Sequence, residues 1–352
     1  MDRRQWLSNV ELRGCDGIPC SVYLPAAVRR LYGAELGDLC AKYPDLGIAP
    51  LAAVEDEDSL APGERAGERF IDAWGCVWEN LQNGIVGQVT GSPLADRDAL
   101  AAYEPPSPAE TGHFHPIDWE HEERIIRSGR DAGVLTRGAV AHGFFFQRLC
   151  YLRGFEALME DIARADPRLD VLCQTVLDFN EGLVRRYLDI GVDVMHFGDD
   201  LGMQDRLTIS PAAWRRWVKP AYARLFGMCR RAGTHVYLHS DGYIVDIMPD
   251  LIECGVTILN PQDLCNGLDE IRRLLKGKVC IDLDIDRQKI VPRKTPAEID
   301  AHVQRCVRTL ASPRGGLMLT CGIYPGTPLE NIDAVLGAMS KYRTFRPGRD
   351  AQ

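Results

Sequence analysis

The sequence has 352 residues, of which 45% are hydrophobic and 26% charged, as expected for a globular chain that buries a sizeable core. Its net charge of −9 argues against a general attraction to nucleic acid or to anionic membranes. No run of about 18 apolar residues occurs, and the first residues lack an apolar signal core, so a cytoplasmic location without a membrane span is expected. The cysteines are scattered singly, which favours small buried side chains over disulfides.

Residues 1–110 are irregular and are expected to form an N-terminal extension of short helices and loops that packs on the rest of the chain. Trp74 and Trp78 are its expected anchors. A proline-rich turn near Pro105 leads into a more regular part. We therefore expect one structural domain, with the extension followed by a regular core over 111–345.

From about residue 134, short apolar runs alternate with segments of helical period. The predicted strands lie near 134–146, 193–197, 234–239, 256–259, 278–283 and 317–320. This alternation predicts a parallel sheet of the α/β class, which is either closed into a barrel or open and doubly wound. The glycine-rich nucleotide-binding motifs of open sheets are absent, so we expect a single (β/α)8 TIM barrel, which typically takes ~250 residues.

Several helices between these strands carry start signals. Ser210 and Pro211 provide an N-cap and a first-turn proline, and Pro220 should kink the same helix. Thr295 and Thr327 each begin a Thr-Pro-x-Glu phrase, which predicts two capping boxes.

Polar side chains collect where the predicted strands end, which is typical of the C-terminal face of a barrel, where active sites lie. An alternative is that α/β proteins simply place polar residues at strand ends. The residues are Asp199, Asp200, Gln204, His239, Asp241, Asn260, Gln262, Asp282, Asp284 and Cys321. Adjacent residues on a strand point to opposite faces, so only one of the first two aspartates should face the site.

His239 and Asp241 are two residues apart, so their side chains point the same way on an extended strand. Cys321 follows a later strand that a barrel could bring to the same side. Imidazole, carboxylate and thiolate are zinc ligands, and three of them leave one open position. The spacing alone also fits a buried histidine and a turn aspartate. His113 and His115 have metal-like spacing as well, but they lie in an expected surface loop.

Seven phrases at these strand ends and upstream of them resemble the uroporphyrinogen decarboxylase-like superfamily. They run in order through nearly the whole chain. The resemblance implies a (β/α)8 barrel with its cleft at the strand ends. The phrases are Asp72-Ala73-Trp74-Gly75-Cys76-Val77-Trp78, Leu152-Arg153-Gly154, Gly198-Asp199-Asp200-Leu201-Gly202-Met203-Gln204, Ile209-Ser210-Pro211-Ala212-Ala213-Trp214, Leu238-His239-Ser240-Asp241-Gly242, Asn260-Pro261-Gln262 and Gly326-Thr327-Pro328-Leu329-Glu330-Asn331-Ile332.

Within this superfamily the sequence is more similar to the zinc- and corrinoid-dependent methyltransferases than to the decarboxylase. The arginine-rich motif with which the decarboxylase binds its polycarboxylate substrate is absent from residues 1–60. The methyltransferases carry a His-x-Cys pair and a distant cysteine as zinc ligands. His239 and Cys321 match this set, and Asp241 replaces the middle cysteine, so the resemblance implies zinc at these three residues.

The hypothesis is an enzyme that demethylates a small methylated compound, such as a methyl ether, onto a corrinoid. Because no Asp-x-His-x-x-Gly corrinoid motif occurs, the corrinoid would be carried by a separate partner protein. Two alternatives are a decarboxylase or lyase for a small carboxylated substrate, and a non-catalytic barrel that binds a small molecule. The expected catalytic residues are Asp199, Asp200 and Asp241, and the expected substrate-binding residues are Gln204, Asn260, Gln262, Asp282 and Asp284.

Overall fold

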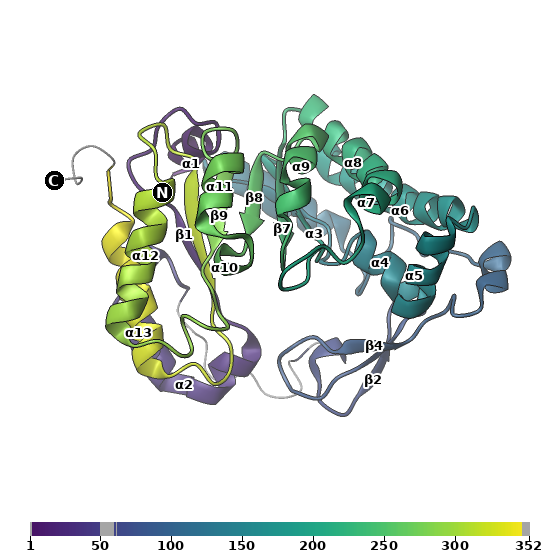
Figure 1. The fold of residues 1–352 in the computed structure, drawn as a ribbon, viewed down its shortest axis with the longest axis horizontal. Coiled ribbons are helices and arrows are strands. Elements are labelled where there is room, and N and C mark those ends of the chain that lie inside the picture. Colours follow the sequence, from purple (N-terminus) through teal and green to yellow (C-terminus); the bar gives the residue numbers. More distant parts are fainter. Residues whose placement is uncertain (1, 50–59, 61, 347–352) are drawn as a thin grey trace.

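The computed structural model describes residues 2–49, 60 and 62–346, and its main feature is a curled parallel sheet surrounded by helices (Figure 1). The strands of this sheet are β1 (Cys20–Tyr23), β5 (Arg137–Ala139), β6 (Val194–Gly198), β7 (His235–Ser240), β8 (Ile258–Pro261), β9 (Cys280–Asp284) and β10 (Leu317–Gly322). They pair in the order β1-β10-β9-β8-β7-β6-β5. Every pair in it is parallel, so the carboxyl ends of all these strands meet at one end of the sheet. This TIM-barrel-like α/β architecture confirms the predicted fold class.

The helices follow the strands in alternation and cover the outside of the curled sheet (Figure 1). They are α1 (Arg3–Val10), α2 (Ala26–Ala41), α3 (Trp119–Asp131), α4 (Phe146–Arg153), α5 (Phe155–Arg164), α6 (Arg168–Ile190), α7 (Pro211–Trp217), α8 (Lys219–Arg231), α9 (Met248–Cys254), α10 (Asp263–Asn266), α11 (Leu268–Leu275), α12 (Pro296–Leu310) and α13 (Leu329–Tyr342). None of the helices in the described ranges has the length and apolar character that a membrane span requires.

The predicted helix starts are confirmed in two of three cases. Ser210 caps α7 by accepting the backbone N–H of Ala213, and the helix breaks before α8, close to Pro220. Thr295 forms the predicted capping box with Glu298 at the start of α12. The second predicted box is wrong, because the hydroxyl of Thr327 donates to the Tyr324 carbonyl and α13 begins without a side-chain cap.

The N-terminal part does more than pack on the barrel, because it supplies the strand β1, in which Val22 lies opposite Cys321 of β10. The barrel therefore begins long before the expected boundary at residue 110. A second, antiparallel sheet consists of β2 (Arg69–Ile71), β3 (Val77–Glu79) and β4 (Gln88–Gly91). It lies outside the barrel near α4 and α5 (Figure 1).

Buried apolar side chains from the strands and the surrounding helices form one large core. Trp74 and Trp78 belong to this core, which confirms them as anchors of the N-terminal part. The cysteines are free thiols, as expected from their spacing.

Candidate functional site

A cavity of about 660 Å³ lies at the carboxyl ends of the central strands. The small antiparallel sheet forms one wall, through residues such as Trp78 and Val89, and α4 and the start of α5 form another. The remaining wall comes from the segments that follow β6, β7, β8 and β9. This is the position at which barrel enzymes bind their substrates.

The lining of the cavity has two chemical halves. The apolar half contains Trp78, Phe146, Tyr151, Phe155 and Met203. The polar half contains two carboxylates and five amides, from Asp200, Asp241, Gln88, Gln147, Gln204, Gln262 and Gln288. No lysine or arginine lines it within the described part of the chain. Such a cavity suits a small, partly apolar ligand that is neutral or positively charged, because a polyanion would meet no compensating cation.

Next to the cavity lie five side chains that we name the strand-end cluster: His142, Asp200, His239, Asp241 and Arg287. His239 is the last but one residue of β7 and lies directly opposite Asn260 of β8, and its Nδ1 lies 2.5 Å from the Asn260 side-chain oxygen. The amide nitrogen of Asn260 donates to the Asp282 carbonyl, so the Asn260 oxygen must face the imidazole. Nδ1 of His239 is therefore the donor, and Nε2 is left to face the carboxylates.

The Nε2 atom of His239 lies 3.2 Å from Asp241 Oδ1 and 3.9 Å from Asp200 Oδ1. Burial alone would lower the pKa of His239, but the hydrogen bond and charge of Asp241, with the charge of Asp200, raise it to about 9. The two carboxylates therefore stabilise a positive charge at the position of Nε2.

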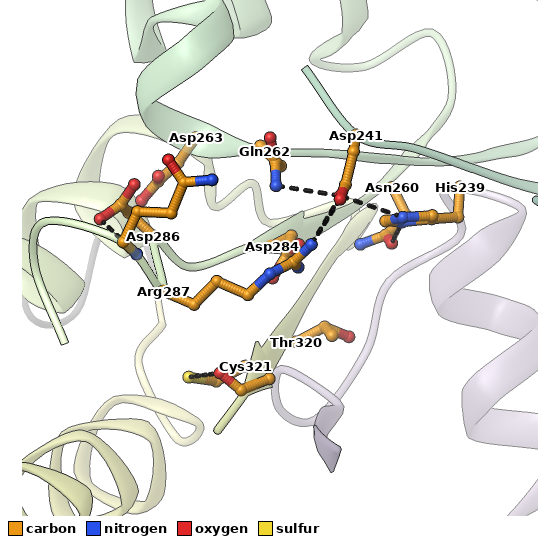
Figure 2. Close-up of polar contacts among 12 residues, drawn as sticks. His239, Asp241, Asn260, Gln262, Asp263, Asp284, Asp286, Arg287, Thr320 and Cys321 are labelled. Atoms are coloured by element: carbon orange, nitrogen blue, oxygen red, sulfur yellow. Dashed lines mark hydrogen bonds and ion pairs between the residues drawn. The ribbon is translucent and has the colours of Figure 1, made fainter. Parts of the chain in front are cut away.

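Asp241 is also held by a guanidinium group (Figure 2). Arg287 donates to both carboxylate oxygens of Asp241 at 2.7 Å, and its other terminal nitrogen pairs with Asp284. Gln262 donates to Asp241 Oδ1 at 2.9 Å. Burial would raise the pKa of Asp241, but His239 and Arg287 hold it well below its usual range. Burial raises the pKa of Asp284 to about 7 despite the charge of Arg287.

Asp200 joins the cluster to the cavity. Its Oδ1 lies 3.2 Å from His142 Nε2 and accepts the backbone N–H of Asp241, while its Oδ2 accepts from the Gln147 amide at 3.1 Å. Burial raises the pKa of Asp200, but the hydrogen bond and charge of His142 outweigh that effect and lower it. The His142 ring, half exposed, lies over Gly198, where a Cβ would come within 2.6 Å of the ring.

Asp199 points away from the cavity, because consecutive residues of an extended segment point to opposite faces and its neighbour Asp200 lines the cavity. It is fully buried and accepts hydrogen bonds from the backbone N–H groups of Phe146 and Gln147 and from the Tyr222 hydroxyl. Burial raises the pKa of this carboxyl to about 6. Asp199 therefore holds the start of α4 through these hydrogen bonds. This predicted catalytic residue is not among the residues that line the cavity.

Asp282 is also placed away from the cavity, although it was expected to bind substrate. It accepts from the Tyr237 and Thr320 hydroxyls and lines a separate hollow with Trp6 and His196. The reason is its position two residues before Asp284, about one layer deeper in the barrel on the same face of β9. Asn260 likewise contacts His239 instead of the cavity, whereas Gln204 and Gln262 line the cavity as expected.

The three predicted zinc ligands are only partly brought together. His239 and Asp241 are neighbours, but Cys321 belongs to none of the groups of potential ligand atoms found in the described residues. Figure 2 shows its sulfur pointing away from His239. Thr320 faces the barrel interior, where it donates to Asp282, so the next residue of β10 faces the opposite side. Cys321 is fully buried, and burial raises its thiol pKa.

His142, Gln147 and Arg287 are site residues that sequence reasoning missed. His142 was hidden because the first predicted strand was extended to 146, whereas β5 ends at Ala139. With that strand end placed correctly, the rule that polar residues follow strand ends would have identified His142. Arg287 lies in a loop after β9 and carries no periodic signal.

Three groups of side chains could hold a metal ion in the described part of the chain. One group, His142, Asp200 and His239, lies within the strand-end cluster, and a second joins His239 and Asp241 of that cluster to Asp284 beside it. The third, Asp263, His302 and Cys306, is completely buried between α10 and α12 and is already joined by a 2.6 Å contact between His302 and Asp263.

A second polar network includes Trp78, one of the aromatic residues that line the cavity. We name this network the buried anchor, and its residues are Asp72, Trp74, Trp78, His113 and Arg148. Arg148 and Asp72 form a 2.7 Å ion pair whose side chains are both 0% exposed. Asp72 also accepts from the Trp78 indole, and the Trp74 indole donates to His113 Nδ1. The expected surface loop at His113 is therefore wrong, because this imidazole is fully buried.

Comparisons with known proteins agree with this architecture. The profile of the family described as uroporphyrinogen decarboxylase (URO-D) matches residues 140–342. The methylcobamide:CoM methyltransferase MtaA of Methanosarcina barkeri is 24% identical over 174 residues, which are 49% of this chain and 48% of MtaA. The uroporphyrinogen decarboxylase of Thermus thermophilus is 31% identical over 134 residues, 36% of each protein. The matches thus span about half, or less, of the length of these curated relatives.

A methyltransferase from Methanosarcina mazei has a similar structure, with a TM-score of 0.63 at 17% sequence identity. The superposition covers 96% of this chain and 98% of that protein. At this identity the likeness establishes the fold, and the chemistry must be argued from the site.

Proposed function

This chain belongs to the uroporphyrinogen decarboxylase family, and we propose that it is a methyltransferase that moves a methyl group from a small methylated compound to the cobalt of a corrinoid. The donor would be a compound such as an aryl methyl ether, and the corrinoid would be carried by a separate protein. Both a decarboxylase and methyltransferases occur among the relatives, so the choice depends on the site.

The lining of the cavity carries this proposal. A decarboxylase substrate brings carboxylates, which proteins bind with arginine or lysine. The cavity presents aromatic rings, amides and two carboxylates, with no lysine or arginine among the described lining residues. The nearby Arg287 already forms ion pairs with Asp241 and Asp284. The aromatic half fits the ring of an aryl ether, and Gln204 and Gln262 would orient its polar substituents.

The proposed transfer defines what the site must supply. The carbon–oxygen bond of the ether breaks, and its electron pair stays on oxygen. The methyl group bonds to Co(I), whose electron pair forms the cobalt–carbon bond and leaves Co(III). The oxygen then takes up a proton. A positive group beside that oxygen lowers the barrier, because negative charge develops there as the bond breaks. Asp200 and Asp241 stabilise such a charge at Nε2 of His239.

A zinc ion at His239, Asp241 and Cys321, as the resemblance implies, does not fit this geometry. Arg287 binds both oxygens of Asp241. The Cys321 side chain lies on the face of β10 opposite to Thr320, and its sulfur points away from His239. No step of the proposed reaction uses a metal ion at these three residues.

One relative supports a corrinoid as the cofactor of the transfer, although its name gives the methylated corrinoid as the methyl donor, the reverse of the direction proposed here. The name of the Methanosarcina barkeri protein, methylcobamide:CoM methyltransferase, states that it handles a methylated corrinoid. We propose that this chain uses the same class of cofactor and receives it from a partner that docks at the open strand ends.

The test is a cobalt methylation assay. The purified chain is mixed with cob(I)alamin and, in turn, an aryl methyl ether, methanol, a methylamine and a methyl thioether, and methylcobalamin is followed by its absorbance. We expect methylation with at least one donor, and the aryl ether to be the best. Absence of methylcobalamin with every donor, together with release of carbon dioxide from small carboxylated aromatics, would establish the decarboxylase alternative instead.

A further inference from the structure

We propose that His142, Asp200 and His239 bind a divalent transition-metal ion such as zinc at the mouth of the barrel. This set shares only His239 with the ligands implied by the family resemblance. The role of the ion in catalysis rests on the proposed methyl transfer, whereas its binding is independent of that function. The argument depends on geometry, on the hydrogen bonds behind each ligand and on the position of Arg287.

The distances fit metal coordination. Zinc ligands lie at ~2.0–2.1 Å from the ion, so two ligands at a tetrahedral angle are about 3.3 Å apart. Asp200 Oδ1 is 3.2 Å from His142 Nε2 and 3.9 Å from His239 Nε2, and all three atoms lie within 4.8 Å of one another. The separation of His142 and Asp200 already matches a tetrahedral edge, and the His239 ring would have to approach Asp200 by about 0.6 Å to form the next edge.

The fold brings these ligands from three adjacent strands. His142 follows β5, Asp200 follows β6 and His239 lies at the end of β7, and β5, β6 and β7 pair side by side. Gly198, at the end of β6, pairs with His239. Because Gly198 has no Cβ, the His142 ring can lie directly above it and reach Asp200.

Each ligand beyond His142 is oriented by a second residue. The Asn260 oxygen holds the Nδ1–H of His239, which leaves Nε2 as the coordinating nitrogen. The Gln147 amide holds Oδ2 of Asp200, which leaves Oδ1 directed at the two imidazoles. Hydrogen bonds of this kind fix the tautomer and orientation of ligands in metalloproteins.

Arg287 distinguishes this set from the neighbouring one. The group formed by His239, Asp241 and Asp284 already contains a cation, because Arg287 pairs with both of its carboxylates. In contrast, within the described residues Asp200 forms ion pairs only with His142 and His239. Two imidazoles and a carboxylate with open positions are a familiar set for zinc and for Fe(II).

The set is also positioned to act on a ligand, because Asp200 lines the cavity. Three protein ligands leave a coordination position for water or substrate. When bound, the ion would supply Lewis acidity to the heteroatom that loses the methyl group.

The experiment measures zinc affinity by competition with a chelator in the full-length wild type and in three variants. We expect one equivalent bound by the wild type and at least a 100-fold loss of affinity in His142→Ala and Asp200→Asn. Cys321→Ser should bind like the wild type. His142 is half exposed and Asp200→Asn keeps the size of the side chain, so both variants should fold.

A Co(II) spectrum provides an independent readout. Cobalt at His142, Asp200 and His239 should give visible ligand-field bands without a thiolate charge-transfer band. A thiolate band that disappears in Cys321→Ser, or zinc retained by His142→Ala but lost from Cys321→Ser, would overturn the proposal in favour of the cysteine-containing set. The absence of bound zinc and cobalt from the wild type would also overturn it. Both measurements remain decisive whether or not the chain methylates cobalamin.

Discussion

The strand-end cluster and the buried anchor contain the same kinds of group, carboxylate, imidazole and guanidinium, but they differ in access to solvent. In the buried anchor, Asp72 and Arg148 are 0% exposed and are covered by aromatic rings. In the strand-end cluster, Asp200, Asp241 and His142 remain 29–48% exposed beside a cavity. A closed network fixes one arrangement of the chain, whereas an open one can accept a ligand.

The two networks also differ in how their charges are balanced. Arg148 and Asp72 pair one to one. Two of the Arg148 nitrogens have no hydrogen-bond partner among the described residues, and aromatic rings supply the remaining contacts. In the strand-end cluster the two carboxylates of Asp200 and Asp241 outnumber the single guanidinium of Arg287, which also pairs with Asp284 beside the cluster. The excess negative charge attracts a proton or a metal ion to the imidazoles. The lesson is that an unbalanced, accessible network indicates function better than residue type does.

The largest effect should follow from His239→Ala. Loss of the positive position beside the leaving oxygen should slow methyl transfer by ~10²–10⁴-fold. The rate of methylcobalamin formation measures this, and urea unfolding monitors the fold. His121→Ala, which removes an exposed imidazole of α3, is the matched control and should leave both unchanged. Equal rates for His239→Ala and the wild type would contradict the catalytic role assigned to the strand-end cluster.

Arg148→Met should affect stability instead. It leaves the Asp72 carboxylate buried without its cation, which should cost about 3–5 kcal/mol of the free energy of unfolding. The double variant Asp72→Asn with Arg148→Met should recover part of this loss, because no charge then remains buried. Urea denaturation measures both variants. Zinc affinity of the folded single variant should equal that of the wild type, and a large drop would show that the two networks are coupled.

Asn260→Ala tests whether a residue behind the strand-end cluster orients one of the proposed metal ligands, His239. Without the Asn260 oxygen, the His239 ring loses the contact that fixes its tautomer, so zinc affinity should fall by ~10–100-fold. Gln204→Ala is the control, because this amide contacts Gln288 and does not touch the proposed ligands. Equal zinc affinity in the two variants would mean that Asn260 does not orient a ligand.

The smallest effect concerns pH and the buried anchor. Burial, with the charge of Arg148, holds the pKa of His113 well below its ordinary value. Below pH ~6.5 this histidine takes up a proton in the unfolded chain but not in the folded one, so stability falls as pH falls, by up to ~1.4 kcal/mol per pH unit. His113→Gln should show a shallower loss between pH 6.5 and 5 in urea unfolding. An unchanged slope would show that His113 titrates in the folded protein.

The strands of the parallel sheet other than β1, and the strand-end position of the site, could be predicted from the sequence, because apolar runs with polar ends have a direct physical cause in a parallel barrel. All six predicted strands occur, although β5 is much shorter than its apolar run. The failures have local causes. A strand end placed seven residues too late hid His142, and the alternation of faces around Thr320 directs Cys321 away from the site.

Other features of the site depend on tertiary contacts. Asp199 and Asp200 are the same residue type, so the sequence does not distinguish their roles. The backbone N–H groups at the start of α4 donate to Asp199, which leaves Asp200 to face the cavity. Arg287 reaches Asp241 from a loop 46 residues away, which no local pattern reports. Partners that are remote in sequence therefore decided which polar residues were free for a ligand.

The central claim is that this chain moves a methyl group from a donor heteroatom to cobalt. The most direct test uses an aryl methyl ether carrying carbon-13 in its methyl group, with cob(I)alamin as acceptor and the wild-type chain as catalyst. We predict that the label appears on cobalt, in the same molar amount as the free phenol that is formed. Label that remains in the ether, or a phenol formed without labelled methylcobalamin, would contradict the account.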